Sequence, residues 1–161
     1  MPKFATMSPT HVSGKKEYAW NNFRTGGYVA LGETWLHVDL SGKSMVEVAD
    51  IIRTSGPANK TSAAIDEFEK LLSLSPGDYI AVNNANDGLF GIGVVKSGYR
   101  FQKHKHDTGS ANRDEFYSHF IDVEWRQTAY VRRVDVIQPA TVVPRLQPFG
   151  ILNARPFRRP S

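Results

Sequence analysis

The chain has 161 residues, 40% of them hydrophobic and 11% aromatic, which fits one folded domain and argues against a disordered chain. It contains no cysteine, which excludes disulfides and thiolate metal sites, and it has no apolar run typical of a signal peptide or a membrane span. These features predict a soluble, cytoplasmic protein, and its formal net charge is +4.

The first third of the chain predicts a strand, a helix and a second strand. The strand covers residues 4–8, the helix covers 15–24, and the second strand follows Gly26-Gly27 at residues 28–32. Residues 33–43 read as an irregular segment that carries Trp35, His37 and Asp39.

Two helices are expected next. Ser44-Met-Val-Glu47 fits a capping box, and Met45, Val48, Ile51 and Ile52 follow it at helical spacing until Gly56-Pro57. A second apolar stripe predicts a helix over residues 61–74. Ser41-Gly-Lys-Ser44 resembles the end of a phosphate-binding P-loop, but the first glycine of that motif would fall at His37, so we reject nucleotide hydrolysis.

After Leu74 the apolar period becomes two, which predicts strands. We expect strands at 78–82, 89–95, 119–125 and 130–137, an extended segment at 99–102 and a polar loop at 103–113. Trp125 alternates with Ile121 and Val123 and is predicted to be a core residue, as is Trp20 on its helix.

The end of the chain differs in composition. Residues 139–161 contain five prolines, so we predict a tail or linker without a packed element and a domain over residues 1–138. Arg145, Arg155, Arg158 and Arg159 carry the whole net charge, because the other 16 basic residues balance the 16 acidic ones. The predicted fold class is α+β: a small, curled, mostly antiparallel β-barrel with flanking helices.

Several segments in this order resemble a known family. The segments are Gly27-Tyr-Val-Ala-Leu-Gly32, Ser75-Pro-Gly-Asp-Tyr-Ile80, Gly91-Ile-Gly-Val-Val-Lys-Ser-Gly-Tyr99 and Phe120-Ile-Asp-Val-Glu-Trp125. They are similar to EVE/YTH-type PUA-like domains, including those at the N-terminus of McrB-type methyl-directed restriction proteins. The resemblance spans residues 4–137. It implies a domain that flips a modified base of nucleic acid into an aromatic-lined pocket.

In YTH domains a cage tryptophan follows the second strand, and Trp35 matches it loosely. Further cage aromatics of the family lie before the last long strand, where this chain offers Phe116 and Tyr117 but no tryptophan. Trp35 is therefore a candidate platform for a flipped base, and the alternative is a tryptophan that covers one end of the core.

Polar candidates lie in two further segments. Asn83 and Asn84 lie where a predicted strand ends, at the start of a predicted turn over residues 83–88, and can pair with a base edge. Asn86 lies in the same turn and is a further candidate, although turn chemistry also explains it. The second segment interleaves aromatic and basic residues, which suits a phosphate-contacting edge: Tyr99, Arg100, Lys103, His104, Lys105, His106 and Arg113. The two histidines give only a weak metal signal, and we expect no metal and no cofactor.

These observations predict a binding domain for DNA with a modified base, not an enzyme, that targets a modification-dependent restriction system. A GTPase or nuclease domain or subunit is an expected partner, and a membrane is not. Two alternatives stay open: a reader of modified RNA, and a nucleic-acid-processing enzyme of the PUA-like superfamily.

Overall fold

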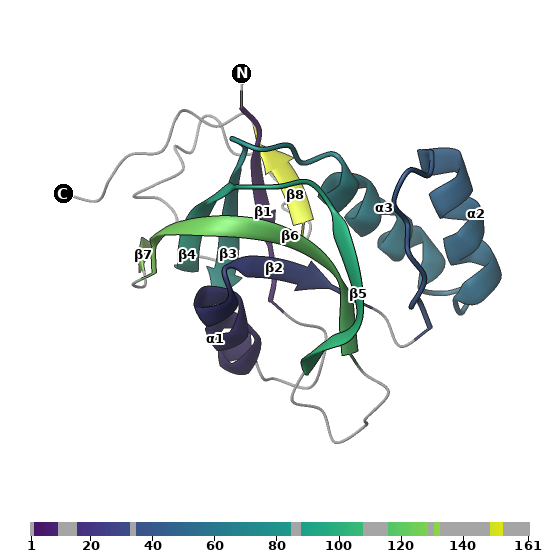
Figure 1. The fold of residues 1–161 in the computed structure, drawn as a ribbon, viewed down its shortest axis with the longest axis horizontal. Coiled ribbons are helices and arrows are strands. Elements are labelled where there is room, and N and C mark those ends of the chain that lie inside the picture. Colours follow the sequence, from purple (N-terminus) through teal and green to yellow (C-terminus); the bar gives the residue numbers. More distant parts are fainter. Residues whose placement is uncertain are drawn as a thin grey trace.

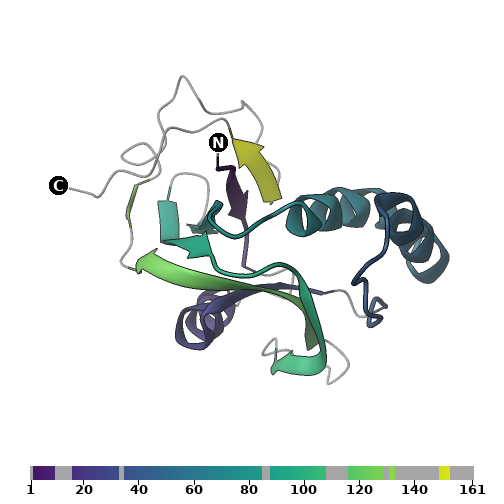
Figure 2. The same ribbon diagram turned by 45° about the horizontal axis from the view of Figure 1, so that its top comes forward.

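The computed structural model describes residues 2–9, 16–32, 35–84, 88–107, 116–128, 131–132 and 149–152; at 16, 103–107, 116–117, 131–132 and 149–152 it describes the backbone alone. Figure 1 shows a strongly curled sheet with α1 under it and α2 and α3 beside it. Figure 2 shows that the α2–α3 pair extends away from the sheet on one side. The predicted α+β class and the curled, mostly antiparallel sheet with flanking helices are confirmed.

The elements follow in chain order. They are β1 (Phe4–Met7), α1 (Lys16–Gly26), β2 (Tyr28–Leu31), α2 (Met45–Ser55), α3 (Thr61–Leu72), β3 (Tyr79–Asn84), β4 (Gly88–Val95), β5 (Arg100–Asp107), β6 (Phe116–Gln127), β7 (Val131–Arg132) and β8 (Phe149–Leu152). The strand order is β2-β6-β4-β3-β1-β8, with β5 paired to β6 and β7 paired to β4. Among the described strands, β1 and β3 alone pair in parallel.

The long strand β6 joins the two parts of the sheet. Phe120 pairs with Ala30 of β2 on one side and with Arg100 of β5 on the other. Farther along, β4 pairs with β6 from Val95↔Val123 to Ile92↔Gln127. Within the described ranges β5 has β6 as its single partner, so β5 lies at an edge of the sheet.

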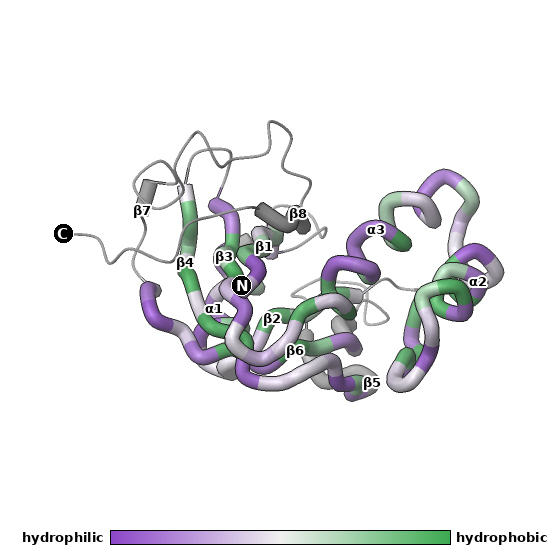
Figure 3. The backbone as a smooth tube through the Cα atoms, turned by 90° about the horizontal axis from the view of Figure 1, so that it is seen from above, coloured by the Kyte–Doolittle hydropathy of each residue, from purple (hydrophilic) through white to green (hydrophobic). Residues whose placement is uncertain are grey.

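The predicted helices are confirmed, and local chemistry explains them. The Ser44 hydroxyl accepts from the Glu47 amide at 3.2 Å, as the capping box predicts. Val48 and Ile52 of α2 are fully buried, as are Phe68 and Leu71 of α3. Figure 3 shows β4 hydrophobic over most of its length, whereas α2 and α3 alternate between hydrophobic and hydrophilic turns.

Aromatic rings fix α1 against the sheet. Trp20 stacks on Phe90 at 5.9 Å and meets the edge of Trp125 at 4.8 Å, and the Trp125 indole donates to the Phe23 carbonyl at 2.8 Å. The prediction that Trp20 belongs to the core is confirmed, whereas Trp125 is partly buried and packs against the core. A Cβ at Gly91 would lie 2.2 Å from the Trp20 ring, so this close approach requires glycine.

Two predictions about irregular segments are wrong. Residues 103–107 belong to β5 and not to a loop, because backbone pairing with β6 forms irrespective of side-chain polarity. Phe149–Leu152 lies in the segment where we expected no packed element, yet it pairs antiparallel with β1, from Phe4↔Leu152 to Met7↔Phe149. The strand itself contains no proline, because Pro148 precedes it and Pro156 follows it, so its backbone amides can donate hydrogen bonds to a partner strand. The domain boundary at residue 138 stays a prediction.

Candidate nucleic-acid interface

The structure separates the predicted site residues into two groups. The segment after Trp35 contacts β6 near its start, because the Leu36 carbonyl binds His119 and the His37 ring binds Ser118. Tyr99, Arg100 and the basic residues of β5 adjoin the same part of β6. Asn83 and Asn84 instead pair with Leu89 and Gly88 at the start of β4. This part of β4 pairs with β7 on its other side, whereas, within the described residues, β4 pairs with β6 only from Ile92 onward. Trp35 and the two asparagines therefore do not border one cleft.

Asn83 and Asn84 belong to β3 and not to the predicted turn. The register between β3 and β4 shifts at Val82/Asn83, which marks a β-bulge. Asn83 is 9% exposed, and its Oδ1 is buried with no hydrogen-bond partner in the part of the chain that the structure describes. Within the described ranges, Asn83 therefore carries an unsatisfied acceptor in the sheet.

Trp35 packs against the hydrophobic core and the end of α2. Its six-membered ring lies so close to Gly56 that a Cβ there would approach to 2.7 Å. Its Nε1 is buried and has no hydrogen-bond partner among the described residues. This packing leaves only part of the indole accessible for a base.

Tyr99 and His119 form the best-defined polar contact near this group. His119 is fully buried, and its Nε2 lies 2.9 Å from the Leu36 carbonyl oxygen, which can only accept, so Nε2 carries the proton. Nδ1 then accepts from the Tyr99 hydroxyl at 2.7 Å, and the Leu40 amide donates to that hydroxyl at 3.2 Å. The network ties the segment from Leu36 to Leu40 to strands β5 and β6.

Burial shifts the pKa values of both side chains in this network. Desolvation, opposed by the hydrogen bond to Leu36, lowers the pKa of His119 to about 4, so the ring is neutral at physiological pH. Desolvation, opposed by the hydrogen bond from Leu40, raises the pKa of Tyr99 to about 12. Both groups are therefore uncharged, and each acts as a hydrogen-bonding group.

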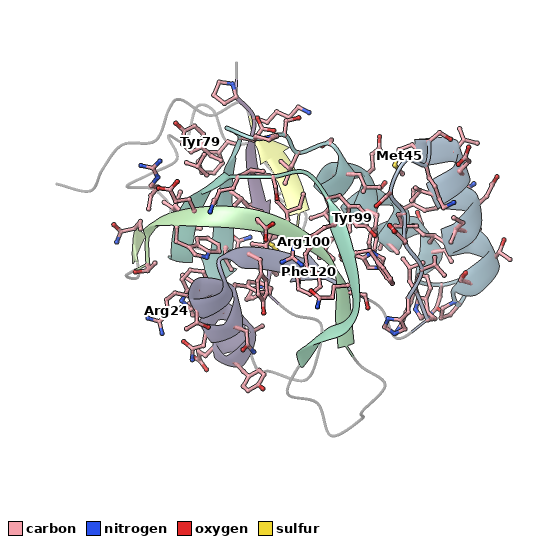
Figure 4. The ribbon with its side chains drawn as sticks, viewed as in Figure 1. Arg24, Met45, Tyr79, Tyr99, Arg100 and Phe120 are labelled. Atoms are coloured by element: carbon pink, nitrogen blue, oxygen red, sulfur yellow. The ribbon has the colours of Figure 1, made fainter. Side chains whose placement is uncertain are left out.

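Arg100 is held in an ion pair. Its Nη2 donates to Asp122 Oδ1 at 3.0 Å and its Nε at 3.1 Å, while the guanidinium lies 4.7 Å from the centroid of the Phe120 ring. Burial acts to raise the pKa of Asp122, but hydrogen bonds from Arg100 and Ser97 outweigh it and lower that pKa. The charge of Arg100 is thus largely balanced within the protein. Figure 4 labels Arg100 and Phe120 near the middle of β6.

The basic run on β5 lies at a large irregularity of the strand. Phe101 pairs with His119 and His106 pairs with Tyr117, so the four residues from Gln102 to Lys105 stand opposite Ser118 alone. Such bulges redirect side chains and are common beside functional sites. The bulge places Lys103, His104 and Lys105 at the sheet edge.

A pocket of about 490 Å³ lies beside Tyr99. Its walls come from the turn before α2, from the first residue of α2, from the end of α3 and from Tyr99: they are Leu40, Ser41, Gly42, Lys43, Met45, Glu69, Leu72, Ser73 and Tyr99. Figure 4 labels Tyr99 on the sheet side and Met45 on the helix side. The volume falls within the range of small-ligand sites.

Sequence reasoning missed His119 and the pocket. The period-two pattern of β6 places His119 on the same side as Ile121, so it could have indicated a buried histidine. The pocket had no comparable signal, because its walls come from residues far apart in the chain.

Asn86 and Arg113 lie outside the described residues, as do the side chains of Lys103, His104, Lys105, His106 and Tyr117. Within the described ranges no group of three or more His, Cys, Asp or Glu residues could hold a metal ion. None of the described helices is long and apolar enough to cross a membrane.

Comparisons with known proteins give a family and a similar solved structure. A family model described as a domain of unknown function (DUF8426) matches residues 6–142. The YTH domain of the Zygosaccharomyces rouxii MRB1 protein, solved in complex with N6-methyladenosine RNA, is 18% identical with a TM-score of 0.37, over 86% of this chain and 69% of that chain. No curated protein matches.

Proposed function

We propose that this chain, which belongs to the family described as a domain of unknown function (DUF8426), is a binding domain that reads a modified base in nucleic acid. The observation that carries the proposal is the position of the basic run. Lys103, His104 and Lys105 lie on the bulge of an edge strand, and that strand starts beside a pocket edged by Tyr99. The sequence resemblance to EVE/YTH-type domains supports the same function.

Basic side chains at a sheet edge suit the phosphate backbone. Each phosphate that a lysine neutralises releases counterions, which gives affinity without sequence information. Because Arg100 is paired with Asp122, the phosphate contacts are assigned to the bulge and to the arginines after residue 139.

Base recognition requires a second contribution. Extruding a base costs a few kcal/mol, which stacking on an aromatic ring and hydrogen bonds to the base edge offset. Burial of a methyl group contributes only ~0.8 kcal/mol to the binding free energy. Strong selectivity therefore needs a pocket in which the plain base leaves a void or leaves a polar group without a hydrogen bond. We propose DNA as the nucleic acid and a modification-dependent restriction system as the setting, with a GTPase or nuclease as partner.

Fluorescence anisotropy tests the proposal. Labelled duplexes carrying one 5-methylcytosine, 5-hydroxymethylcytosine or N6-methyladenine are compared with the plain duplex and with RNA of the same sequence. We expect tighter binding to at least one modified DNA duplex. Equal affinity for all DNA duplexes would contradict base reading, and a preference confined to modified RNA would reassign the nucleic acid.

A matched pair of variants locates the phosphate contacts. Lys103→Gln with Lys105→Gln should reduce the slope of log K against log salt by ~0.9 for each phosphate that is no longer neutralised. Lys60→Gln, at the exposed start of α3, is the control and should leave the slope unchanged. Identical slopes for both variants would place the interface elsewhere.

A further inference from the structure

We propose that the pocket between the Ser41–Lys43 turn, α3 and Tyr99 receives a nucleobase that carries an exocyclic amino group. This inference rests on the proposed function in so far as the base comes from nucleic acid, and it names the base class and the residues that hold it. A free nucleoside offers the same chemistry, so the experiments below separate the two sources.

Tyr99 supplies an aromatic wall whose position is fixed. Its hydroxyl is committed to Leu40 and His119, so it is not available to a ligand. The His119 ring stacks on Tyr99 at 5.7 Å with an interplanar angle of 23°. The part of Tyr99 that lines the pocket therefore offers ring surface, on which a base can pack.

The opposite walls contribute apolar side chains. Leu40, Met45 and Leu72 come from the turn, from α2 and from α3, and Met45 and Leu72 are only partly buried. A flat heterocycle with an aromatic ring on one side and aliphatic groups on the other loses water from its apolar surface.

Elimination identifies the polar groups that can meet a ligand. The Ser41 hydroxyl donates to Asp39 at 2.6 Å, and the Ser73 hydroxyl donates to the Lys70 carbonyl at 2.7 Å. Lys43 and Glu69 form no ion pair with any other residue in the described part of the chain. Among the charged side chains, the pocket therefore offers one ammonium group and one carboxylate.

The carboxylate selects the base class. Glu69 can only accept hydrogen bonds when ionised, so the ligand must present N–H donors to it. The exocyclic amino groups of cytosine, adenine and guanine all do so, and in cytosine and adenine a ring nitrogen beside the amino group accepts from a donor such as Lys43. Uracil and thymine present one N–H between two carbonyl oxygens, which a carboxylate repels. Glu69, Leu72 and Ser73 lie three and four residues apart, and so share one side of α3.

Methionine methyl resonances provide a direct test with free nucleosides. Of the chain's three methionines, Met45 lines the pocket and Met7 is 1% exposed in the core. Cytidine and adenosine, titrated into protein with ¹³C-labelled methionine methyl groups, should shift Met45 and leave Met7 unchanged. Uridine should bind at least about tenfold more weakly, as expected for a hydrogen bond to a charged group. No shift of Met45 with any nucleoside would overturn the proposal.

Two variants test the role of the carboxylate. Glu69→Gln can both donate and accept, so it should reduce the preference for cytidine over uridine to within about twofold. Asp66→Asn, exposed on the same helix and outside the pocket, should keep the preference. An unchanged preference in Glu69→Gln would overturn the assignment.

Oligonucleotides separate this inference from the proposed function. Ser41→Trp places an indole at the exposed rim of the pocket and should abolish the preference for a modified duplex while keeping salt-dependent binding. If the preference survives in Ser41→Trp and Glu69→Gln, the pocket assignment fails and the proposed function stands. If nucleosides shift Met45 but no oligonucleotide binds, the proposed function fails and the ligand is a free nucleoside or nucleotide.

Discussion

The Tyr99 hydroxyl donates to Nδ1 of the fully buried His119 across 2.7 Å, which fixes His119 as a neutral ring with its proton on Nε2. The hydrogen bond joins the residue before β5 to β6 near its start and, through the Leu36 carbonyl, to the segment after Trp35. A second proton on His119 would remove the acceptor that Tyr99 uses.

Acid should destabilise the fold through His119. Its folded pKa of about 4 lies below the ordinary value of 6.5, so the unfolded chain binds more protons between these values. The stabilisation is complete above about pH 6.5 and is lost as the pH falls towards 4, by roughly 3 kcal/mol. Urea unfolding at pH 7, 5.5 and 4.5 measures this loss.

The variant His119→Gln is the control, because glutamine can accept from Tyr99 and donate to Leu36 without titrating. Other groups near His119 are His37, which lowers its pKa, and Asp39, which raises it, and both are retained in the variant. Equal pH dependence in the two proteins would show that another group is responsible.

Removing the Trp35 indole should lower stability. The ring packs on the core and on Gly56, so Trp35→Ala should cost about 3 kcal/mol in the free energy of unfolding. Gly56→Ala should destabilise the wild type by crowding the ring, and should cost much less in the Trp35→Ala background. Thermal or urea unfolding of the four proteins gives the coupling. If Trp35→Ala instead melts like the wild type and loses binding to modified DNA, Trp35 is the base platform.

Replacing Asn83 should not harm the fold. Its Oδ1 is buried without a partner among the described residues, so Asn83→Leu should keep stability or raise it by about 1 kcal/mol. Because Asn83 lies away from the pocket beside Tyr99, the preference for a modified base should also be unchanged. Loss of that preference in a folded Asn83→Leu protein, measured by anisotropy, would assign Asn83 to base recognition.

Arg100 should contribute little to phosphate binding. Its guanidinium is bound by Asp122, so Arg100→Gln should leave the slope of log K against log salt unchanged. The reciprocal variant Asp122→Asn frees the cation and should increase the affinity for any nucleic acid. The partly exposed pair should change stability by no more than about 1 kcal/mol. A slope that falls by ~0.9 in Arg100→Gln would show that Arg100 exchanges Asp122 for a phosphate.

The arginines after residue 139 should add affinity without specificity. Replacing Arg145, Arg155, Arg158 and Arg159 with glutamine should flatten the salt dependence by ~0.9 for each phosphate that these arginines neutralise in the wild type. The ratio of affinities for modified and plain duplexes should stay the same. Substitution is preferable to truncation because β8 pairs with β1. A changed ratio would give these arginines a part in base recognition.

Local patterns predicted most of the fold. The cap at Ser44 and the apolar stripes of α2 and α3 act within a few residues, and the sequence therefore determines both helices closely. The parallel pairing of β1 with β3, the strand at 149–152 and the extension of β5 depend on partners far along the chain. These elements are determined by backbone hydrogen bonds to distant strands, and the periodicity of the side chains does not indicate such hydrogen bonds.

The candidate site was harder to predict for the same reason. Tyr99 was identified because it stands beside a basic run, and it lines the pocket. Glu69 and Lys43 lie on an exposed helix side and in a turn, where charged residues are common and give no signal. Only the packing of α3 towards the sheet brings them together with Tyr99.

The pairing of β6 also sets the order in which the protein can fold. Tyr28 and Leu31 of β2 pair with Asp122 and His119, about ninety residues later in the chain. During synthesis β2 therefore cannot pair with β6 until residues 119–122 have left the ribosome, whereas α2 and α3 can form within their own segment. Pairings so distant close large loops, at an entropic cost, before their hydrogen bonds form, and they slow folding. Until β6 arrives, the apolar residues of β2 lack their partner strand, and this is the interval in which a chaperone would act.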